Sequence, residues 1–261
     1  MPKNDPGLPD VLERLGVVAW ELPRAAIRQM AAHSHAEAQL CGLDSGLAIL
    51  ETDAGAWTCP PGRCVWIPPN TVHSFRSCGK ISGWMVRLNA RAGSRLPVEP
   101  KILALSPLLK EIVVRMMTWV EHPEANAANR RLVHVLYDEI CAASQMRLHL
   151  PAPRDPALKR LATLMAEDLS GVARDLAALA REVGLSQRSL FRNFQKETGL
   201  SPGQWRRQMQ VLRSLELLAK GLSVTETSFE VGYESAGAFI RAFRQTLGVT
   251  PTEYAHEQRS H

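Results

Sequence analysis

Three histidines near the start of the chain have a spacing suited to binding a ligand or a metal ion. His33, His35 and Gln39 are separated by even numbers of residues, so they would point to one face of a regular strand. Glu37 shares this spacing, and His73 follows in a later segment. Three imidazoles with one oxygen ligand suit zinc, iron, nickel or copper. The pattern therefore predicts a divalent metal site, a polar effector pocket, or polar side chains that satisfy buried hydrogen bonds.

A second set of candidate residues is basic and lies in the C-terminal third. Arg188, Arg192 and Lys196 recur every four residues and would share one side of a helix. This helix is expected to run from Gln187, itself a candidate contact, to about Thr198. An arginine can donate two hydrogen bonds to a guanine edge, and a lysine can contact a phosphate. The same stripe on an isolated helix would be an ordinary solvated face, so its interpretation depends on the fold around it.

The segment that holds this basic stripe occurs twice in the chain. In each copy an apolar helix is followed by a glycine, Gly184 or Gly232, where a left-handed residue is needed. A serine, Ser186 or Ser235, then begins a second short helix. The repeated unit is predicted to be a helix-turn-helix, whose second helix enters the major groove of DNA. The duplication therefore favours DNA reading over a solvated face.

The second helix of the later copy carries different side chains. Ala236 and Gly237 open it and offer no hydrogen bonds to bases. Arg241 is the one strong candidate for a base contact, Ile240 is suited to a thymine methyl group, and Arg244 lies within reach of the DNA backbone. We expect this copy to supply position and affinity more than sequence discrimination.

The rest of the chain divides into zones by residue pattern. Residues 16–90 contain short alternating runs separated by Gly and Pro, which is typical of a β-sandwich or barrel. Apolar spacing predicts helices at 106–122 and 128–147, and two prolines in 149–154 predict a linker. The expected fold class is α+β, with a barrel domain and an all-α domain. The predicted domains are residues 1–100 for the barrel, 101–150 for linker helices and 155–261 for the helical domain, whose helix-turn-helix units lie at about 176–198 and 224–247.

The two predicted linker helices carry apolar stripes suited either to a dimer interface or to packing against the barrel. The stripe of the first helix comprises Leu108, Leu109, Ile112, Val113, Met116 and Val120. The stripe of the second comprises Leu132, Val135, Leu136, Ile140 and Cys141. Three tryptophans are likewise suited either to a ligand cavity or to the barrel core, namely Trp57, Trp66 and Trp84.

Composition is that of a globular protein and argues against several other classes. Of the 261 residues, 45% are hydrophobic and 22% charged, and no run approaches the roughly 20 apolar residues of a membrane-spanning helix. The first ten residues lack the features of a signal peptide, and the five cysteines form no CxxC pair. We therefore expect a cytoplasmic protein with reduced thiols and no membrane partner. The net charge of +5 permits a nucleic acid partner without requiring one.

The segment from Leu176 to Tyr254 resembles the DNA-binding domain of the AraC/XylS family of bacterial regulators. The residues that carry the resemblance are Val231-Gly232-Tyr233-Glu234-Ser235, then Phe239-x-Arg241-x-Phe243, then Gly248-x-Thr250-Pro251-x-x-Tyr254. This resemblance implies base contacts at Arg188, Phe191, Arg192, Ala236, Gly237, Ile240 and Arg241. The apolar pair Ala236-Gly237 departs from the family pattern and argues against strong base readout by the second helix.

Two short motifs around the histidines resemble those of cupins. The first is His33-x-His35-x3-Gln39-x6-Gly46, with Gln where cupins usually have Glu. The second is Gly62-x5-Pro68-x-Asn70-x2-His73, with Asn in place of Gly. The resemblance implies that the N-terminal domain is a cupin-like barrel, which is the effector domain common in the AraC/XylS family.

These features predict a sequence-specific transcription regulator whose barrel senses a small-molecule or metal effector. Its expected partners are double-stranded promoter DNA, the effector, a second copy of the chain, and RNA polymerase if it is an activator rather than a repressor. One alternative is a metal-dependent cupin enzyme, such as a dioxygenase, fused to a DNA-binding domain. Another is a constitutive DNA-binding protein whose barrel only dimerises. Because no acid or base resembling a catalytic group accompanies the histidines, we expect no enzymatic activity.

Overall fold

The chain folds into two compact units. A computed structural model describes residues 15–25, 29–89, 96–119, 126–167 and 175–259. The first unit, here called the barrel unit, comprises residues up to Leu50 together with Cys59–Met146. The second, the helical unit, comprises Glu51–Thr58 and the chain from Arg147 onward. Val120 of the predicted stripe lies outside the described residues.

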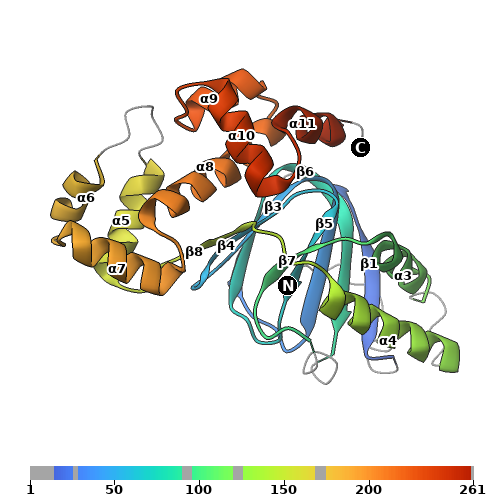
Figure 1. Ribbon diagram of the computed structural model, residues 1–261. Coiled ribbons are helices and arrows are strands. Elements are labelled where there is room, and N and C mark those ends of the chain that lie inside the picture. Colours follow the sequence, from blue (N-terminus) through green and yellow to red (C-terminus); the bar gives the residue numbers. More distant parts are fainter. Residues whose placement is uncertain (1–14, 26–28, 90–95, 120–125, 168–174, 260–261) are drawn as a thin grey trace. The chain divides into compact units, whose positions relative to one another are not determined.

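The barrel unit is built from strands that pair antiparallel (Figure 1). They are β1 (Val17–Ala25), β2 (Gln29–His33), β3 (Ala38–Thr52), β5 (Arg63–Ile67), β6 (His73–Leu88) and β7 (Lys101–Ala104). β6 carries β1 along one end and β2 along the other, and β3 is also its neighbour. β5 bridges β3 and β7. The predicted β-sheet domain is therefore confirmed.

The tryptophans of the barrel unit belong to its core. Trp66 and Trp84 lie in one apolar cluster with side chains of β1 and β6, and both are almost fully buried. The Trp66 indole also donates a hydrogen bond to the Pro97 carbonyl oxygen, 2.7 Å away. Trp57, which belongs to the helical unit, is buried as well. Core packing thus explains the positions of Trp66 and Trp84, whereas Trp57 stacks on the ring of His149.

Two glycines allow the central strands of the barrel unit to approach closely. A Cβ atom on Gly42 of β3 would lie 2.1 Å from Cζ2 of Trp84, and one on Gly83 of β6 would lie 2.1 Å from the Gly42 carbonyl oxygen. Such separations are far below van der Waals contact. The Trp84 ring therefore occupies the space that a side chain at residue 42 would need.

Helix α3 (Pro107–Met117) packs its apolar stripe on the barrel. Ser106 caps its first turn by accepting a hydrogen bond from the Leu109 backbone N–H, as its sequence predicts. Four members of the predicted stripe are buried in the cluster that contains Trp66 and Trp84: Leu109, Ile112, Val113 and Met116. Leu108, the remaining described member of the predicted apolar stripe, is 51% exposed and does not join this cluster. Leu108 lies at the edge of the buried face of α3, where helical spacing alone does not separate buried from exposed residues.

Helix α4 (Ala127–Ala142) also contributes to this core, and it ends short of the predicted residue 147. Its buried apolar residues are Val133, Leu136 and Ile140. Val135 and Cys141, which were assigned to the same side, are exposed, and Leu132 is half-buried. The buried arc is rotated by about one residue from the predicted one.

The helical unit begins with a short strand pair where a linker was predicted. Strand β4 (Gly55–Cys59) pairs antiparallel with β8 (His149–Pro151). In this pair Gly55 lies opposite Pro151, and Trp57 lies opposite His149. Two side chains of a later helix hold this pair, because Trp205 donates to the Pro151 carbonyl oxygen at 2.7 Å and Gln208 donates to that of His149. The prolines do prevent a helix, but they permit a strand that is fixed in place.

Helices make up the rest of the helical unit. They are α5 (Pro156–Glu167), α6 (Leu176–Glu182), α7 (Gln187–Thr198), α8 (Pro202–Ala219), α9 (Val224–Glu230), α10 (Ala236–Leu247) and α11 (Pro251–Arg259). A capping box of Ser201 and Gln204 begins α8. Trp205 and Met209 of α8 share a core with α5, α6 and α7, whereas its Gln210 donates to the Val231 carbonyl oxygen beside α9. None of the described helices is long and apolar enough to span a membrane.

Replacing Gly42 by alanine should destabilise the barrel unit by about 1–3 kcal/mol, because the new methyl group must displace the Trp84 ring or β3. Thermal or urea unfolding followed by tryptophan fluorescence measures the change. The matched control is Gly203→Ala on α8, where nothing lies within 4 Å of the added Cβ. Equal stability of the two variants would show that the strands do not approach as described.

Candidate functional site

The two helix-turn-helix units have the turn that their sequences predict. After α6, Gly184 has φ of +73°, and after α9, Gly232 has φ of +83°. Ser186 then caps α7 by accepting from the Ser189 backbone N–H, and Ser235 caps α10 in the same way. Each turn therefore sets a short helix at a fixed angle to the helix before it.

Helix α7 has one buried face and one basic face. Leu190 and Phe194 are fully buried, and the Phe194 ring meets that of Trp205 edge to face at a centroid distance of 5.9 Å. The polar side chains predicted to contact DNA are all exposed, namely Gln187, Arg188, Arg192 and Lys196. Among the described residues, no carboxylate forms an ion pair with the three cations on this face.

Phe191 of α7 differs from its basic neighbours. Its ring is half-buried and packs against the core shared by α5, α6, α7 and α8. The exposed remainder of the ring is apolar and suited to contact with a base edge or methyl group rather than to a hydrogen bond.

Helix α10 offers fewer free polar groups than α7. Phe239 and Phe243 are buried in its core-facing side, whereas Ala236 and Ile240 are half-buried. Gly237 and Arg241 are exposed, and an Arg241 guanidinium nitrogen lies 3.7 Å from the position that a Cβ of Gly237 would occupy. The Arg241 side chain thus extends back over the start of the helix.

The second cation of α10, Arg244, is exposed but has an acidic neighbour. Hydrogen bonds from Thr250 lower the pKa of Glu253, and the positive charge of Arg244 lowers it further. The positive charge of Arg244 is therefore partly compensated by a nearby carboxylate. No such interaction is found for the cations of α7 among the described residues.

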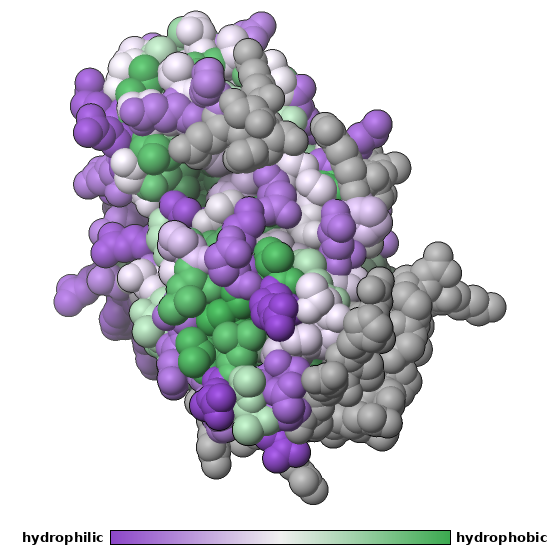
Figure 2. Space-filling model, turned by 90° about the vertical axis from the view of Figure 1, so that its right-hand side faces the viewer, coloured by the Kyte–Doolittle hydropathy of each residue, from purple (hydrophilic) through white to green (hydrophobic). Residues whose placement is uncertain are grey.

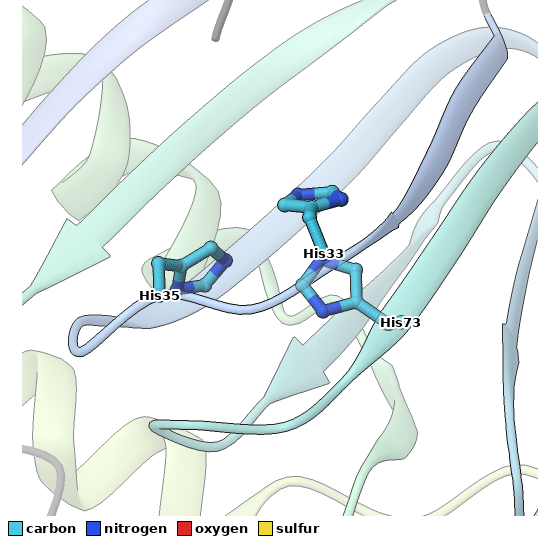
Figure 3. Close-up of side chains that lie close together, drawn as sticks. All are labelled: His33, His35 and His73. Carbon is cyan, nitrogen blue, oxygen red and sulfur yellow. The ribbon is translucent and has the colours of Figure 1, made fainter.

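In the barrel unit, the three predicted histidines come together from two strands and a connecting segment (Figure 3). His33 ends β2 and pairs in register with His73, which begins β6. His35 lies two residues beyond β2, before β3 begins. The ring centroids of His33 and His73 are 4.4 Å apart, and that of His35 is 5.1 Å from His73.

The two other predicted members of this site are placed differently. His33, His35 and Gln39 do not share one strand face, because the chain leaves β2 at His33 and enters β3 at Ala38. Gln39 is buried on β3 opposite Ile67 of β5. The three histidines form a possible ligand group without Glu37, whose carboxylate is not part of it. The prediction that even spacing places His33, His35 and Gln39 on one strand face was therefore wrong. The pairing of β2 with β6 brings the histidines together instead, and it does not include Gln39.

Asn70 is a residue whose structural role the sequence pattern only hinted at. It is the one non-glycine residue with positive φ among those described, at +58°, and asparagine tolerates this conformation better than most residues. Its backbone N–H donates to the His35 carbonyl oxygen at 2.8 Å. This bond ties the segment that carries His35 to the turn that leads into His73.

The surroundings of His73 favour its neutral imidazole. Burial lowers the pKa of His73, and the neighbouring His33 and His35 lower it further, although a hydrogen bond to the Thr71 carbonyl oxygen acts in the opposite direction. The ring of His73 is therefore more readily uncharged than a histidine in water.

Comparison with known proteins assigns both units. An AraC-like ligand binding domain matches residues 23–151, and a helix-turn-helix domain matches residues 179–257. The HTH-type transcriptional regulator NimR of Escherichia coli K12 is 32% identical over 225 residues, which is 85% of this chain and 81% of that protein. This chain belongs to the AraC family of transcription regulators.

Two further proteins are similar to this chain over most of its length. The arabinose operon regulatory protein of Salmonella typhimurium is 22% identical and is matched over 80% of each chain. Among solved structures, ToxT of Vibrio cholerae with a bound unsaturated fatty acid has a TM-score of 0.39 at 13% identity, covering 92% of this chain and 94% of ToxT.

Membership of the AraC family decides between the function classes left open by the sequence. The chain is a transcription regulator with a ligand-binding domain and a DNA-binding helix-turn-helix domain, and it is not an enzyme. The alternative of a metal-dependent cupin enzyme fused to a DNA-binding domain has no support.

Replacing Arg192 by alanine should remove about 1–3 kcal/mol of discrimination at one base pair of the binding site. The reason is that Arg192 is exposed on the basic face of α7 and forms no ion pair with a carboxylate of the described segments. Binding to a library of single-base variants of a selected site measures the loss. Lys159→Ala, an exposed cation on α5, is the matched control and should preserve all base preferences. A drop in affinity that is equal for every sequence would instead make Arg192 a phosphate contact.

Proposed function

We propose that α7 reads the base sequence of the promoter and that α10 mainly anchors the protein on DNA. The observation that carries this division is the contrast between the two exposed faces. α7 presents Arg188, Arg192 and Lys196, none of which has an acidic partner in the part of the chain that the structure describes. α10 begins with Ala236 and Gly237, and its cations are one arginine folded over the helix start and one beside a glutamate.

Base reading by α7 follows from the chemistry of its side chains. Arg188 and Arg192 can each donate two hydrogen bonds to a guanine in the major groove, and Gln187 can pair with adenine. Phe191 is suited to a thymine methyl group, and Lys196 to a phosphate. On α10, Arg241 supplies the one strong base contact, Ile240 an apolar one and Arg244 a backbone contact.

The helix between the two units is suited to spacing them on DNA. α8 has 18 residues and is therefore about 27 Å long at 1.5 Å per residue. One turn of the DNA double helix is roughly 34 Å. We propose that α7 and α10 enter successive major grooves on one side of the duplex, with DNA bending where the two lengths differ.

The N-terminal domain, residues 1–100, is proposed to sense the effector at the cluster of His33, His35 and His73. Glu37 and Gln39 remain candidates for contacts to a ligand larger than an ion. An effector acts on DNA binding only if it binds two states of the protein with different affinity. A constitutive regulator whose barrel only dimerises would give the effector no role.

We further propose a homodimer formed through helices of the 101–150 segment, with 155–261 as the DNA-binding domain. The predicted stripes are occupied by barrel packing, so the supporting residues are the apolar side chains left exposed: Leu108 and Val114 on α3 and Val135 on α4. Figure 2 faces the side on which α3 and α4 lie in Figure 1 and shows apolar surface gathered there. The proposed setting is the cytoplasm, with RNA polymerase as a further partner if the protein activates transcription.

The division of labour between the units is tested by selection from a random DNA pool with two variants. The pair Arg188→Ala and Arg192→Ala, combined in one chain, should flatten base preferences over a half-site, because both base-reading guanidinium groups are lost. Arg241→Ala should weaken binding while altering preference at no more than one base pair. Loss of preference over as many positions in Arg241→Ala as in the double variant would contradict the proposal.

The dimer is tested by equilibrium sedimentation of the full chain. We expect a dimer at micromolar concentration, and Val114→Glu should shift it toward monomer because a charge would be buried in the interface. Val98→Glu is the control, since Val98 is 86% exposed but lies outside α3 and α4. A wild-type monomer, or equal effects of both substitutions, would contradict this interface.

A further inference from the structure

The histidine cluster has the ligand arrangement of a metal site. One ring nitrogen of each of His33, His35 and His73 lies within 4.8 Å of the corresponding nitrogens of the other two. Three nitrogens bound to one ion in tetrahedral geometry, at about 2.0–2.1 Å, lie roughly 3.4 Å from one another. The separations in the cluster exceed that value by at most about 1.4 Å, and Figure 3 shows the three rings close together.

Hydrogen bonds fix which nitrogen of each ring carries the proton. Nδ1 of His33 lies 2.9 Å from the Ala31 carbonyl oxygen, and Nδ1 of His73 lies 2.8 Å from that of Thr71. Nδ1 of His35 lies 2.6 Å from the carbonyl oxygen of Glu37. A carbonyl oxygen only accepts, so each Nδ1 must be the donor.

The consequence of these bonds is that all three Nε2 atoms have a free lone pair when the rings are neutral. A metal-bound histidine commonly has this arrangement, with one nitrogen on the metal and the other donating to a carbonyl or carboxylate group. Three independent backbone bonds thus set the same tautomer at three neighbouring rings.

The Nε2 atom of His35 has no hydrogen-bond partner among the described residues, although it is buried. Nearly all buried polar side-chain atoms in proteins are paired, so such an atom needs an explanation. A lone pair of this kind can accept a hydrogen bond or bind a cation. The nearest rings cannot supply a donor, because the His33 and His73 protons are committed to backbone carbonyl groups.

Backbone hydrogen bonds and strand pairing hold the three rings together. His33 and His73 are register partners in adjacent antiparallel strands, which puts their side chains on the same face. The bond from the Asn70 N–H to the His35 carbonyl oxygen fixes the third ring relative to the start of β6. The residues His33 and His35 are half-buried, whereas Nε2 of His35 is itself buried. The backbone therefore preorganises the site.

We propose that His33, His35 and His73 bind one divalent transition-metal ion through their Nε2 atoms. The ligand set is three imidazoles with no carboxylate or thiolate among the described residues of the group. Imidazole ligands suit zinc, nickel, cobalt, copper or iron and disfavour magnesium and calcium, which prefer oxygen. Three protein ligands leave at least one coordination position for water or for an anionic group of an effector.

This inference deepens the proposed effector function, since it makes the ion part of the site where an effector binds. The three neutral ligands leave the ion with its full positive charge. A carboxylate or another anionic oxygen donor is therefore the class of effector group that the open position would take. Metal binding itself requires neither DNA nor a second ligand.

The test is a titration of the full-length protein, purified without a histidine tag and stripped of metal with a chelator, with Co²⁺. We expect one equivalent to bind with visible d–d absorption typical of a low-coordinate centre, and Zn²⁺ to displace it. His33→Gln and His35→Gln should each weaken Co²⁺ binding by at least about tenfold. Both residues lie on the half-buried side of the cluster, so these variants should retain the circular dichroism and thermal unfolding of the wild type.

The matched control is His134→Gln, on the exposed side of α4 and outside the cluster. It should bind Co²⁺ as the wild type does. A strong thiolate charge-transfer band in the near ultraviolet would assign the ion to the cysteines and overturn the proposal. Burial raises the pKa of the Cys64 thiol to about 12 and also raises that of Cys59, so neither of these thiols is expected to give such a band. Absence of one-equivalent binding at micromolar Co²⁺, or equal binding by His35→Gln and His134→Gln, would also overturn it.

The outcome is independent of the DNA-reading proposal because the titration contains no DNA. Failure to bind metal would remove the ion from the effector site and leave the roles of α7 and α10 unaffected. Failure of the Arg188 and Arg192 substitutions to alter base preference would refute the DNA-reading proposal and leave the metal site standing.

Discussion

The helical unit depends on two glycines, Gly184 and Gly232, whose backbone lies in the left-handed region of conformation. Nothing lies within 4 Å of a Cβ built on Gly184, so its φ of +73°, rather than crowding, is what an alanine would strain. The turn it makes joins α6 and α7, which are 7 and 12 residues long and too short to be stable alone. Their stability comes from packing at the angle that the turn imposes, and that angle decides which face of α7 stays exposed.

Once the turns are fixed, α8 determines how the two copies cooperate. Its first half shares a core with α5, α6 and α7 through Trp205 and Met209, and its Gln210 reaches the Val231 carbonyl oxygen in the second copy. A duplicated unit joined in this way can divide its work, because only one copy needs to discriminate bases if both add phosphate contacts. The unequal exposed faces of α7 and α10 are consistent with that division.

Local signals predicted the parts of the fold that local interactions determine. The caps Ser106, Ser186 and Ser235 and the left-handed turn after α6 could be found from sequence because each involves residues only a few positions apart. Strand β8 was taken for a linker because its partner, β4, lies more than 90 residues earlier, and no local pattern encodes that pairing.

Long-range pairing also explains what was mistaken in the barrel unit. The histidines were grouped correctly but for a wrong reason, since the β2–β6 register and the bond from Asn70 to the His35 backbone bring them together. Val135 was placed on the apolar side of α4 and Val133 was not, although Val133 is the residue that is buried. Helical spacing identifies an apolar face, but it does not show which part of that face packs against the rest of the unit. The tautomer of each ring depends on a hydrogen bond to a backbone carbonyl group, and no sequence motif identifies these bonds.

The structure of the full chain bound to a selected double-stranded DNA site tests the central claim most directly. We predict α7 in the major groove, with Arg188 or Arg192 hydrogen-bonded to base edges. We also predict that α10 lies in the next groove and makes most of its contacts with phosphates. A complex in which α10 makes most of the base contacts, or in which the basic face of α7 points away from the DNA, would contradict the account.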